Sequence, residues 1–478
     1  LVHDIFSVAD SVSAKDGGTF SGTIAAAGLS TSSLGTSNFR AGVNAGNSIA
    51  SGGNYNTVVG DEAGTAITTG DGNTAVGYQA LDANTTASDN TAIGRAAGTA
   101  ITTGFNNALV GRNAGDALTI GNNNVAVGMN ALSAEVAGDR NVAIGYGSLT
   151  AQTNASTVDT YNVAVGFNAG TEVTTGTQNT LIGSLTGDSL TTGNSNTTVG
   201  YNSLSALTAG DRNVAIGHGT LAALNVTDGS DTYNTAVGYS AGNDITTGVQ
   251  NTLIGALAGD AITTGNENTA VGYQALSATT TGAKNTAIGY TALDVNTEGE
   301  FNTAVGRNAL GANTTADGNV AVGNNAMLAN TTGTDNVAIG TAALDANTTA
   351  SRNTAVGKSS LSANTTGFEQ VAIGALALLS CTTGSVNVAI GYGSLQGITT
   401  AQENVAIGKY AGQLTTTGRN NISLGHNSQP SSATVDYQCT LGNSSISNLR
   451  CNDTSISSLS DERDKTNIVD IPLGLDFI

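Results

Sequence analysis

A five-residue pattern of polar and apolar positions recurs along most of the chain. It reads Asn, Thr or Val, Ala, Val or Ile, and Gly, as in residues 285–289, and we call its last residue the landmark glycine. Of the 22 intervals between successive landmark glycines, 20 are 17-residue steps and two are 21-residue steps, which is the signature of a solenoid. The 23 landmark glycines stand at positions 60, 77, 94, 111, 128, 145, 166, 183, 200, 217, 238, 255, 272, 289, 306, 323, 340, 357, 374, 391, 408, 425 and 442.

The 17-residue unit is too short for the helix pair of a helical repeat. Val, Ile and Thr favour strands, whereas Asn and Gly suit tight turns. We therefore predict an all-β fold, a parallel β-solenoid (β-roll) of 17-residue coils. In one coil we expect a strand over residues 74–76, a turn at Gly77, a second strand near Ala80 and Leu81, and a return through residues 84–86. Stacking 22 steps at about 4.8 Å gives a shaft of about 105 Å.

A second regularity concerns the inside of the coil. Where the fourth residue after the landmark glycine is Leu, the seventh is usually polar, as with Leu81 and Asn84. Where the fourth is Gly, the seventh is aliphatic, as with Gly98 and Ile101. One bulky side chain per coil is thus expected to fill one hole, as close packing requires. Leu414 lies one residue early and breaks the rule.

The central strand is apolar on both faces. In residues 285–289 we expect Ile288 to point inward and Ala287 outward, so that a stripe of small side chains lies on the surface. Soluble proteins rarely leave so long an apolar stripe in water. We therefore expect an intimate homotrimer of parallel shafts that forms a rod. The Asn four residues before each landmark glycine, present in 21 of 23 coils, is expected to form a hydrogen-bonded Asn ladder.

The two 21-residue intervals each insert four residues before a pentapeptide. The insertions occupy residues 155–161 and 227–233, so the second follows the first after four coils, and they share an Asp-Thr-Tyr ending. Insertions in a solenoid often form a binding face. The alternative is a duplicated block of four coils that copied a neutral loop.

Composition and charge exclude several classes of function. Asp and Glu number 35 against 15 Lys and Arg, so the chain carries −20, and three associated chains carry −60. Such a surface repels nucleic-acid phosphate. The longest apolar run, residues 371–379 with Gly374 inside it, is far shorter than the roughly 20 residues that span a bilayer. No signal peptide is recognisable at the start, and since the first residue is Leu1, the sequence is expected to be a fragment.

Candidate catalytic chemistry is sparse in the repeats. The acids occur singly in turns, without the paired carboxylates of a glycosidase, and aromatic sugar platforms are not evident among the 4% of aromatic residues. The three histidines are isolated, and the three cysteines lack metal-site spacing. We expect no enzyme activity in the shaft, no cofactor and no metal.

Three segments resemble known families. Residues 17–24, Gly-Gly-Thr-Phe-Ser-Gly-Thr-Ile, resemble segments of phage tail-fibre proteins. The repeats resemble the Asn-Ser-Val-Ala-Ile-Gly coils of trimeric autotransporter adhesin heads, which implies a left-handed trimeric roll. Residues 460–468, Ser-Asp-Glu-Arg-Asp-Lys-Thr-Asn-Ile, resemble the opening of the peptidase S74 intramolecular chaperone domain at the ends of phage tail fibres and tailspikes.

The third resemblance implies a maturation step. In the S74 family the domain promotes trimerisation of a β-structured shaft and then cuts itself off with a Ser–Lys dyad. Ser460 matches the Ser beside the cut, and Lys465 matches the Lys that serves as its base. Asp464 stands where many members have Leu. At most, then, we expect a single-turnover self-cleavage at this junction.

The expected organisation has four parts. Residues 1–40 form a β-rich attachment segment, 41–442 the solenoid shaft, 443–459 a neck, and 460–478 the truncated start of an S74-like domain. The expected function is a structural and adhesive trimeric fibre of a virion that projects a host-binding surface, with a host surface glycan or protein as receptor and no membrane insertion. A bacterial cell-surface or secreted adhesin or filament subunit is the alternative, and a polysaccharide-degrading tailspike is a third.

Overall fold

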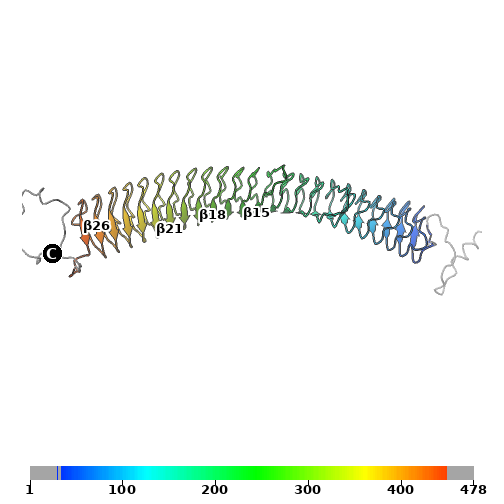
Figure 1. Cartoon of the computed structure of the whole chain (residues 1–478), viewed down its shortest axis with the longest axis horizontal. Helices are drawn as coiled ribbons and strands as arrows, with labels where there is room; N and C mark the ends of the chain where they lie inside the picture. Colours follow the sequence, from blue (N-terminus) through cyan, green and yellow to red (C-terminus); the bar gives the residue numbers. More distant parts are fainter. Residues whose placement is uncertain (1–28, 31–33, 449–478) are drawn as a thin grey trace, which may run out of the picture.

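The computed structural model describes residues 29–30 and 34–448, which form a curved shaft of stacked coils (Figure 1). One 25-stranded sheet follows the shaft, and all of its strands except β1 run parallel to their neighbours. No helix occurs among the described residues. The prediction of an all-β parallel solenoid with a 17-residue coil is confirmed. At about 4.8 Å per step, the 24 parallel strands extend over about 110 Å.

Each coil contributes one strand of three residues to this sheet. A separate two-stranded sheet pairs β8 with β10, and β10 lies within the first insertion. The strands are β1 (Leu29–Ser30), β2 (Phe39–Ala41), β3 (Thr57–Val59), β4 (Thr74–Val76), β5 (Thr91–Ile93), β6 (Ala108–Val110), β7 (Val125–Val127), β8 (Gly138–Asp139), β9 (Val142–Ile144), β10 (Val158–Asp159), β11 (Val163–Val165), β12 (Thr180–Ile182), β13 (Thr197–Val199), β14 (Val214–Ile216), β15 (Thr235–Val237), β16 (Thr252–Ile254), β17 (Thr269–Val271), β18 (Thr286–Ile288), β19 (Thr303–Val305), β20 (Val320–Val322), β21 (Val337–Ile339), β22 (Thr354–Val356), β23 (Val371–Ile373), β24 (Val388–Ile390), β25 (Val405–Ile407), β26 (Ile422–Leu424) and β27 (Cys439–Leu441).

The rest of each coil consists of turns. In the coil of Gly77, φ is positive at Gly77 (134°), Gln79 (56°) and Leu81 (52°). Left-handed residues at alternate positions break an extended chain, so the second strand predicted near Ala80 and Leu81 is wrong. The turns still bond from coil to coil, because the Leu81 amide donates to the Ala97 carbonyl oxygen at 3.0 Å.

The landmark glycine is required for two reasons. At Gly255, φ is 138°, a value that residues with a Cβ rarely adopt. A Cβ there would also lie 2.4 Å from the carbonyl oxygen of Gly272 in the next coil. The backbones therefore approach too closely at this corner for any side chain.

The orientation predicted for the central strand is wrong. Ala287, the middle residue of β18, is fully buried, whereas Ile288 is 40% exposed. Side chains alternate along a strand, and the buried Asn285 two residues before Ala287 sets the phase of that alternation. Alanine faces the narrow interior because the bulky side chain of each coil comes from a turn.

The structure confirms that one bulky side chain per coil fills the interior, either from the fourth or from the seventh position after the landmark glycine. Leu81 and Ile101 are both fully buried, and a Cβ at Gly98 would lie 3.0 Å from Leu81 and 3.1 Å from Ile101. The middle strand position is Leu at three places, 109, 181 and 253, each flanked by coils with Gly in the fourth position; a Cβ at Gly170 would meet Leu181 at 2.5 Å. Leu414, the exception to the rule, is exposed.

The predicted Asn ladder is confirmed. The Asn285 side-chain oxygen accepts the backbone N–H of Asn302 at 3.0 Å, and its amide donates to the Gly299 carbonyl oxygen at 2.8 Å. In other coils, as at Asn353, the side-chain amide also donates to the preceding Asn, at 3.2 Å. The ladder satisfies buried backbone groups at the corner before every strand, which an apolar residue could not do.

The ladder begins one coil earlier than the 17-residue spacing indicates. β2 pairs in parallel with β3 and is followed by Gly42, and the step from Gly42 to Gly60 is one residue longer than the regular one. β1 runs antiparallel to β2 and covers the N-terminal edge of the sheet, which otherwise offers a template for aggregation. Most of the predicted attachment segment (1–40) and of the neck (443–459), and all of residues 460–478, lie outside the described residues.

Candidate functional site

The two residues assigned to self-cleavage, Ser460 and Lys465, lie outside the described residues. Their assignment stays a prediction. Within the described part of the chain, the feature that stands out is the outer surface of the strand ladder.

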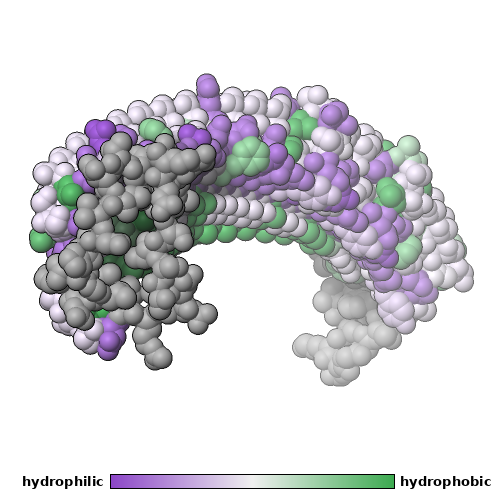
Figure 2. Space-filling view, turned by 60° about the vertical axis from the view of Figure 1, so that its left-hand side comes forward, coloured by the Kyte–Doolittle hydropathy of each residue, from purple (hydrophilic) through white to green (hydrophobic). Residues whose placement is uncertain are grey.

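We call the outward first and third positions of the three-residue strands from β3 to β27 in the large sheet the front face. The first position is mostly Thr or Val and half-buried, and the third is Val, Ile or Leu. Ile144 is 37% exposed and Ile407 43%. Figure 2 shows hydrophobic and near-neutral rows side by side along the inner side of the curve. The surface stripe is therefore β-branched rather than the alanine stripe predicted from sequence.

One edge of the front face consists of the residues directly after the landmark glycines, and we call it the cationic edge. It carries five Lys or Arg and one acid, Asp61, a formal charge of +4. Aromatic rings fill much of the remainder and stack from coil to coil, with centroids 5.4 Å apart for Tyr146 and Phe167 and for Tyr273 and Tyr290. The cations are Arg95, Arg112, Arg307, Lys358 and Lys409.

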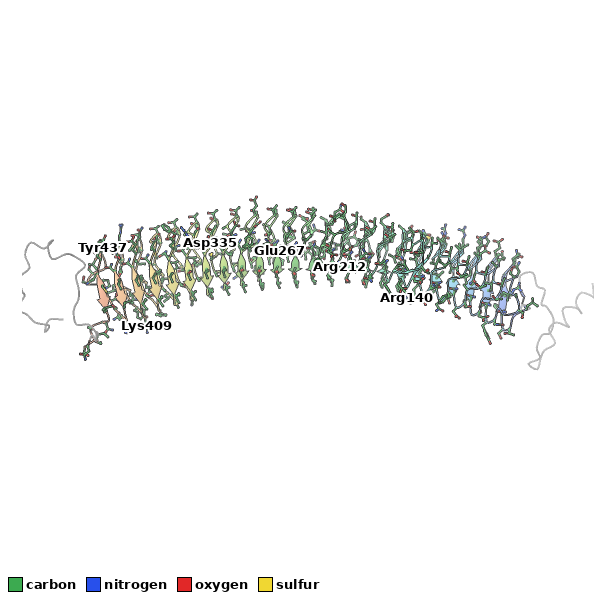
Figure 3. The ribbon with its side chains drawn as sticks, viewed as in Figure 1. Arg140, Arg212, Glu267, Asp335, Lys409 and Tyr437 are labelled. Carbon is green, nitrogen blue, oxygen red and sulfur yellow. The ribbon has the colours of Figure 1, made fainter. Side chains whose placement is uncertain are left out.

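The opposite edge consists of the residues five and six positions before the landmark glycines, and we call it the acidic edge. It carries eleven acids and five cations, a formal charge of −6. Figure 3 shows Lys409 at one edge of the ladder and Asp335 and Tyr437 at the other. The acids are Asp71, Asp89, Asp139, Asp211, Glu267, Glu300, Asp317, Asp335, Glu369, Glu403 and Asp436, and the cations are Arg140, Arg212, Lys284, Arg352 and Arg419.

Each insertion is fastened to the coil before it by the same three side chains. Arg140 pairs with Asp159 and lies 5.6 Å from the centre of the Tyr161 ring, whose hydroxyl donates to Asp159 at 3.0 Å. The second insertion repeats the arrangement four coils later with Arg212, Asp231 and Tyr233. These side chains are used within the chain, which favours the duplicated block over a binding loop.

Several turn acids have a structural task. The side chain of Asp71 accepts the backbone N–H of Asn54 in the preceding coil at 2.6 Å, and Asp317 accepts that of Glu300 at 2.7 Å. These carboxylates complete the backbone hydrogen bonding between coils at a corner where strand pairing has ended.

A second set of acids stands at the fifth position after the landmark glycine. Burial raises the pKa of Asp116, Asp188, Asp260, Asp294 and Asp345 above the ordinary value of 3.8, and Glu172 and Asp244 raise those of Asp188 and Asp260 further. One carboxylate oxygen is buried without a hydrogen-bond partner in all of these except Asp294.

We predict that acidification stabilises the shaft through this second set. Because the folded pKa values lie above the unfolded ones, the folded state holds more protons just above pH 3.8, and stability rises as pH falls into that window. Replacing all five by Asn should raise the thermal midpoint at pH 7, and the difference from the unaltered chain should shrink towards pH 4. Circular dichroism melts at both pH values check this. A difference that stays constant or widens on acidification would contradict it.

Comparison with known proteins gives no family. No protein-family model matches the chain, and no curated protein matches it. In the described residues there is no helix long and apolar enough to cross a membrane, and no group of three or more His, Cys, Asp or Glu side chains that could hold a metal ion.

The sequence shows Tyr or Phe directly after many landmark glycines, but the stacking of these rings from coil to coil was not predicted. Eight of the 20 Tyr and Phe residues follow a landmark glycine, and the regular steps of the repeat bring these eight into one column. His218 lies between Tyr201 and Tyr239 in that column, with ring centroids 5.3 and 5.4 Å away. The signal was their position within the repeat and not their number.

Proposed function

We propose that this chain forms the shaft of an extended, homotrimeric fibre of a virion, which holds a host-binding surface away from the particle. The observation that carries the proposal is the uninterrupted parallel ladder from β2 to β27. Each coil contacts only its neighbours, so the fold grows in one dimension and provides length rather than an enclosed site.

The mechanical basis of this function is the hydrogen bonding between coils. Every strand pairs in register with the next, and the Asn ladder and the turn amides add bonds at the corners. Bending the shaft sharply would break several of these bonds in one coil together. A stiff spacer is the expected consequence.

The proposal of three copies is supported by the front face. Its β-branched rows continue through more than twenty coils, and monomeric proteins rarely expose a contiguous apolar patch larger than a few hundred Å². Packing against two further copies would remove these rows from water.

Self-cleavage at Ser460 belongs to the same proposal. Lys465 would accept the proton of the Ser460 hydroxyl, whose oxygen would attack the carbonyl carbon of the preceding peptide bond. The C–N bond would break as Lys465 passes the proton to the released amino group of Ser460, and water would then hydrolyse the ester that joins the two parts. In the product of the full gene, Ser460→Ala should abolish the cut, as read by intact mass. A cut that persists in this variant would overturn the assignment.

A bacterial cell-surface or secreted adhesin is the alternative, because the same ladder would serve it. Antibodies against the shaft, applied with gold label to virus particles and to cells of the source, separate the two. We expect label on thin appendages of the particles. Label confined to the surface of uninfected cells would overturn the virion assignment in favour of the adhesin.

A further inference from the structure

We propose that the copies of this chain associate in parallel and in register through the front face, with the cationic edge of one copy against the acidic edge of its neighbour. This inference rests on the proposed self-association of the shaft. It assigns the surface through which the copies touch and the relative direction of their shafts, neither of which follows from the number of copies.

The size of the front face suits a stable contact. Two rows of side chains about 7 Å apart, with their edges, make a strip about 13 Å wide along about 110 Å of shaft. The strip thus offers about 1,400 Å² per copy, against the roughly 800 Å² per partner of a standard interface. Aromatic residues and Arg, which border the strip, are enriched in interfaces.

The charges of the two edges select the direction. If two copies meet face to face with antiparallel shafts, each edge lies against the same edge of the other copy, so +4 meets +4 and −6 meets −6. With parallel shafts, as in any ring about the shaft axis, the cationic edge meets the acidic edge. Like charges across an interface cost several kcal/mol, whereas opposite charges speed association and fix the register.

The register follows from single coils. Arg95 and Asp89 lie on opposite edges of one coil, and so do Lys409 and Glu403. Copies aligned without stagger bring each of these cations to the height of a partner's carboxylate. The coil of Gly357 instead has a cation on both edges, Lys358 and Arg352. The charge of Arg352 is already paired with Glu369 of its own chain, at 3.1 Å.

A native cysteine can be used to test whether the shafts run parallel or antiparallel. Cys439 is the first residue of β27, at the C-terminal end of the front face, and is exposed. Parallel copies bring their Cys439 side chains to one height, whereas antiparallel copies separate them by most of the shaft. Cys381 does not compete, because it is fully buried and burial raises the pKa of its thiol to about 11.

The crosslinking experiment uses the full chain with Cys451→Ser, oxidised with copper phenanthroline or treated with a short bismaleimide. We expect covalent dimers joined through Cys439, as mapped by mass spectrometry. Their absence in an oligomer of unchanged mass would overturn the parallel arrangement.

A charge exchange tests the edges independently. Lys409→Glu alone should weaken association at least tenfold at low salt, and Lys409→Glu with Glu403→Lys should restore it. In antiparallel copies, Lys409→Glu would instead strengthen association, since like edges meet, and that result would overturn the proposal.

The face itself is tested by Ile288→Lys, with Thr281→Lys, an exposed residue in the turns of the neighbouring coil, as the matched control. We expect a folded monomer for the first and unchanged association for the second. If the chain with Ile288→Lys still forms the oligomer, the contact lies elsewhere and this proposal is wrong. The proposed fibre function would not be affected, because it is tested separately by the antibody labelling.

Discussion

Replacing Gly255 by alanine is expected to cost about 3–5 kcal/mol, or to prevent that coil from forming. The new Cβ would lie 2.4 Å from the carbonyl oxygen and 2.7 Å from the carbonyl carbon of Gly272, and these backbone atoms cannot rotate away. The residue would also keep a φ of 138°, which costs about 1–3 kcal/mol without glycine.

The measurement is denaturant unfolding together with limited proteolysis, which locates the opened coil. Gly229→Ala is the matched control, since its φ is also positive (73°) but no atom lies within 4 Å of a Cβ there. We expect cleavage near residue 255 in the first variant alone. Equal stability of the two variants would contradict the close approach of the coils.

Replacing Glu135 by leucine is expected to cost about 3–5 kcal/mol, although the same structural position holds leucine elsewhere in the chain. Glu135 is fully buried, and its carboxylate accepts the backbone N–H groups of Val136, Ala137 and Gly138 at 2.6–2.9 Å. It also accepts the backbone and side-chain N–H groups of Asn154 at 3.1 and 2.9 Å.

The chain holds its own control for this site. In the second copy of the block, four coils on, Leu207 and Val226 replace Glu135 and Asn154, and the Ala209 amide donates to the Val226 carbonyl oxygen instead. Glu135→Leu with Asn154→Val should therefore recover at least half of the loss caused by Glu135→Leu. Additive losses, measured by denaturant unfolding of the four variants of a double-mutant cycle, would show that the pair is not a unit.

The sequence determines the coil length and the Asn ladder because both depend on strict repetition. A position that must be Gly, or must be Asn, at every step is visible without coordinates. The hole filled by Leu81 or Ile101 is visible for the same reason, since a change at one position is answered at another.

The orientation of the strand was predicted wrongly, because Ala287 and Ile288 are both apolar and the pattern alone allows either to face inward. The information lay in Asn285, whose side chain must reach buried backbone groups and which therefore fixes the inward phase. The missing second strand has a similar cause. Leu81 has a strand-compatible side chain, but its φ of 52° is imposed by the turn and is not encoded in the residue type.

The front face could be located only after this correction. The residues of the cationic and acidic edges can then be read from the repeat, because residues such as Lys409 and Glu403 occupy fixed positions on either side of each strand. The dyad assigned to Ser460 and Lys465 rests on the motif alone, and its test is the cleavage experiment.

The central claim is that every repeat adds one rung of fixed rise to a continuous ladder. Deleting residues 201–272 removes four coils and joins Gly200 to Tyr273, which keeps the repeat in phase. Electron microscopy of the purified shaft should show an intact particle whose contour is shorter by about 19 Å, four steps of about 4.8 Å. A collapsed particle, or one whose length is unchanged, would contradict the ladder.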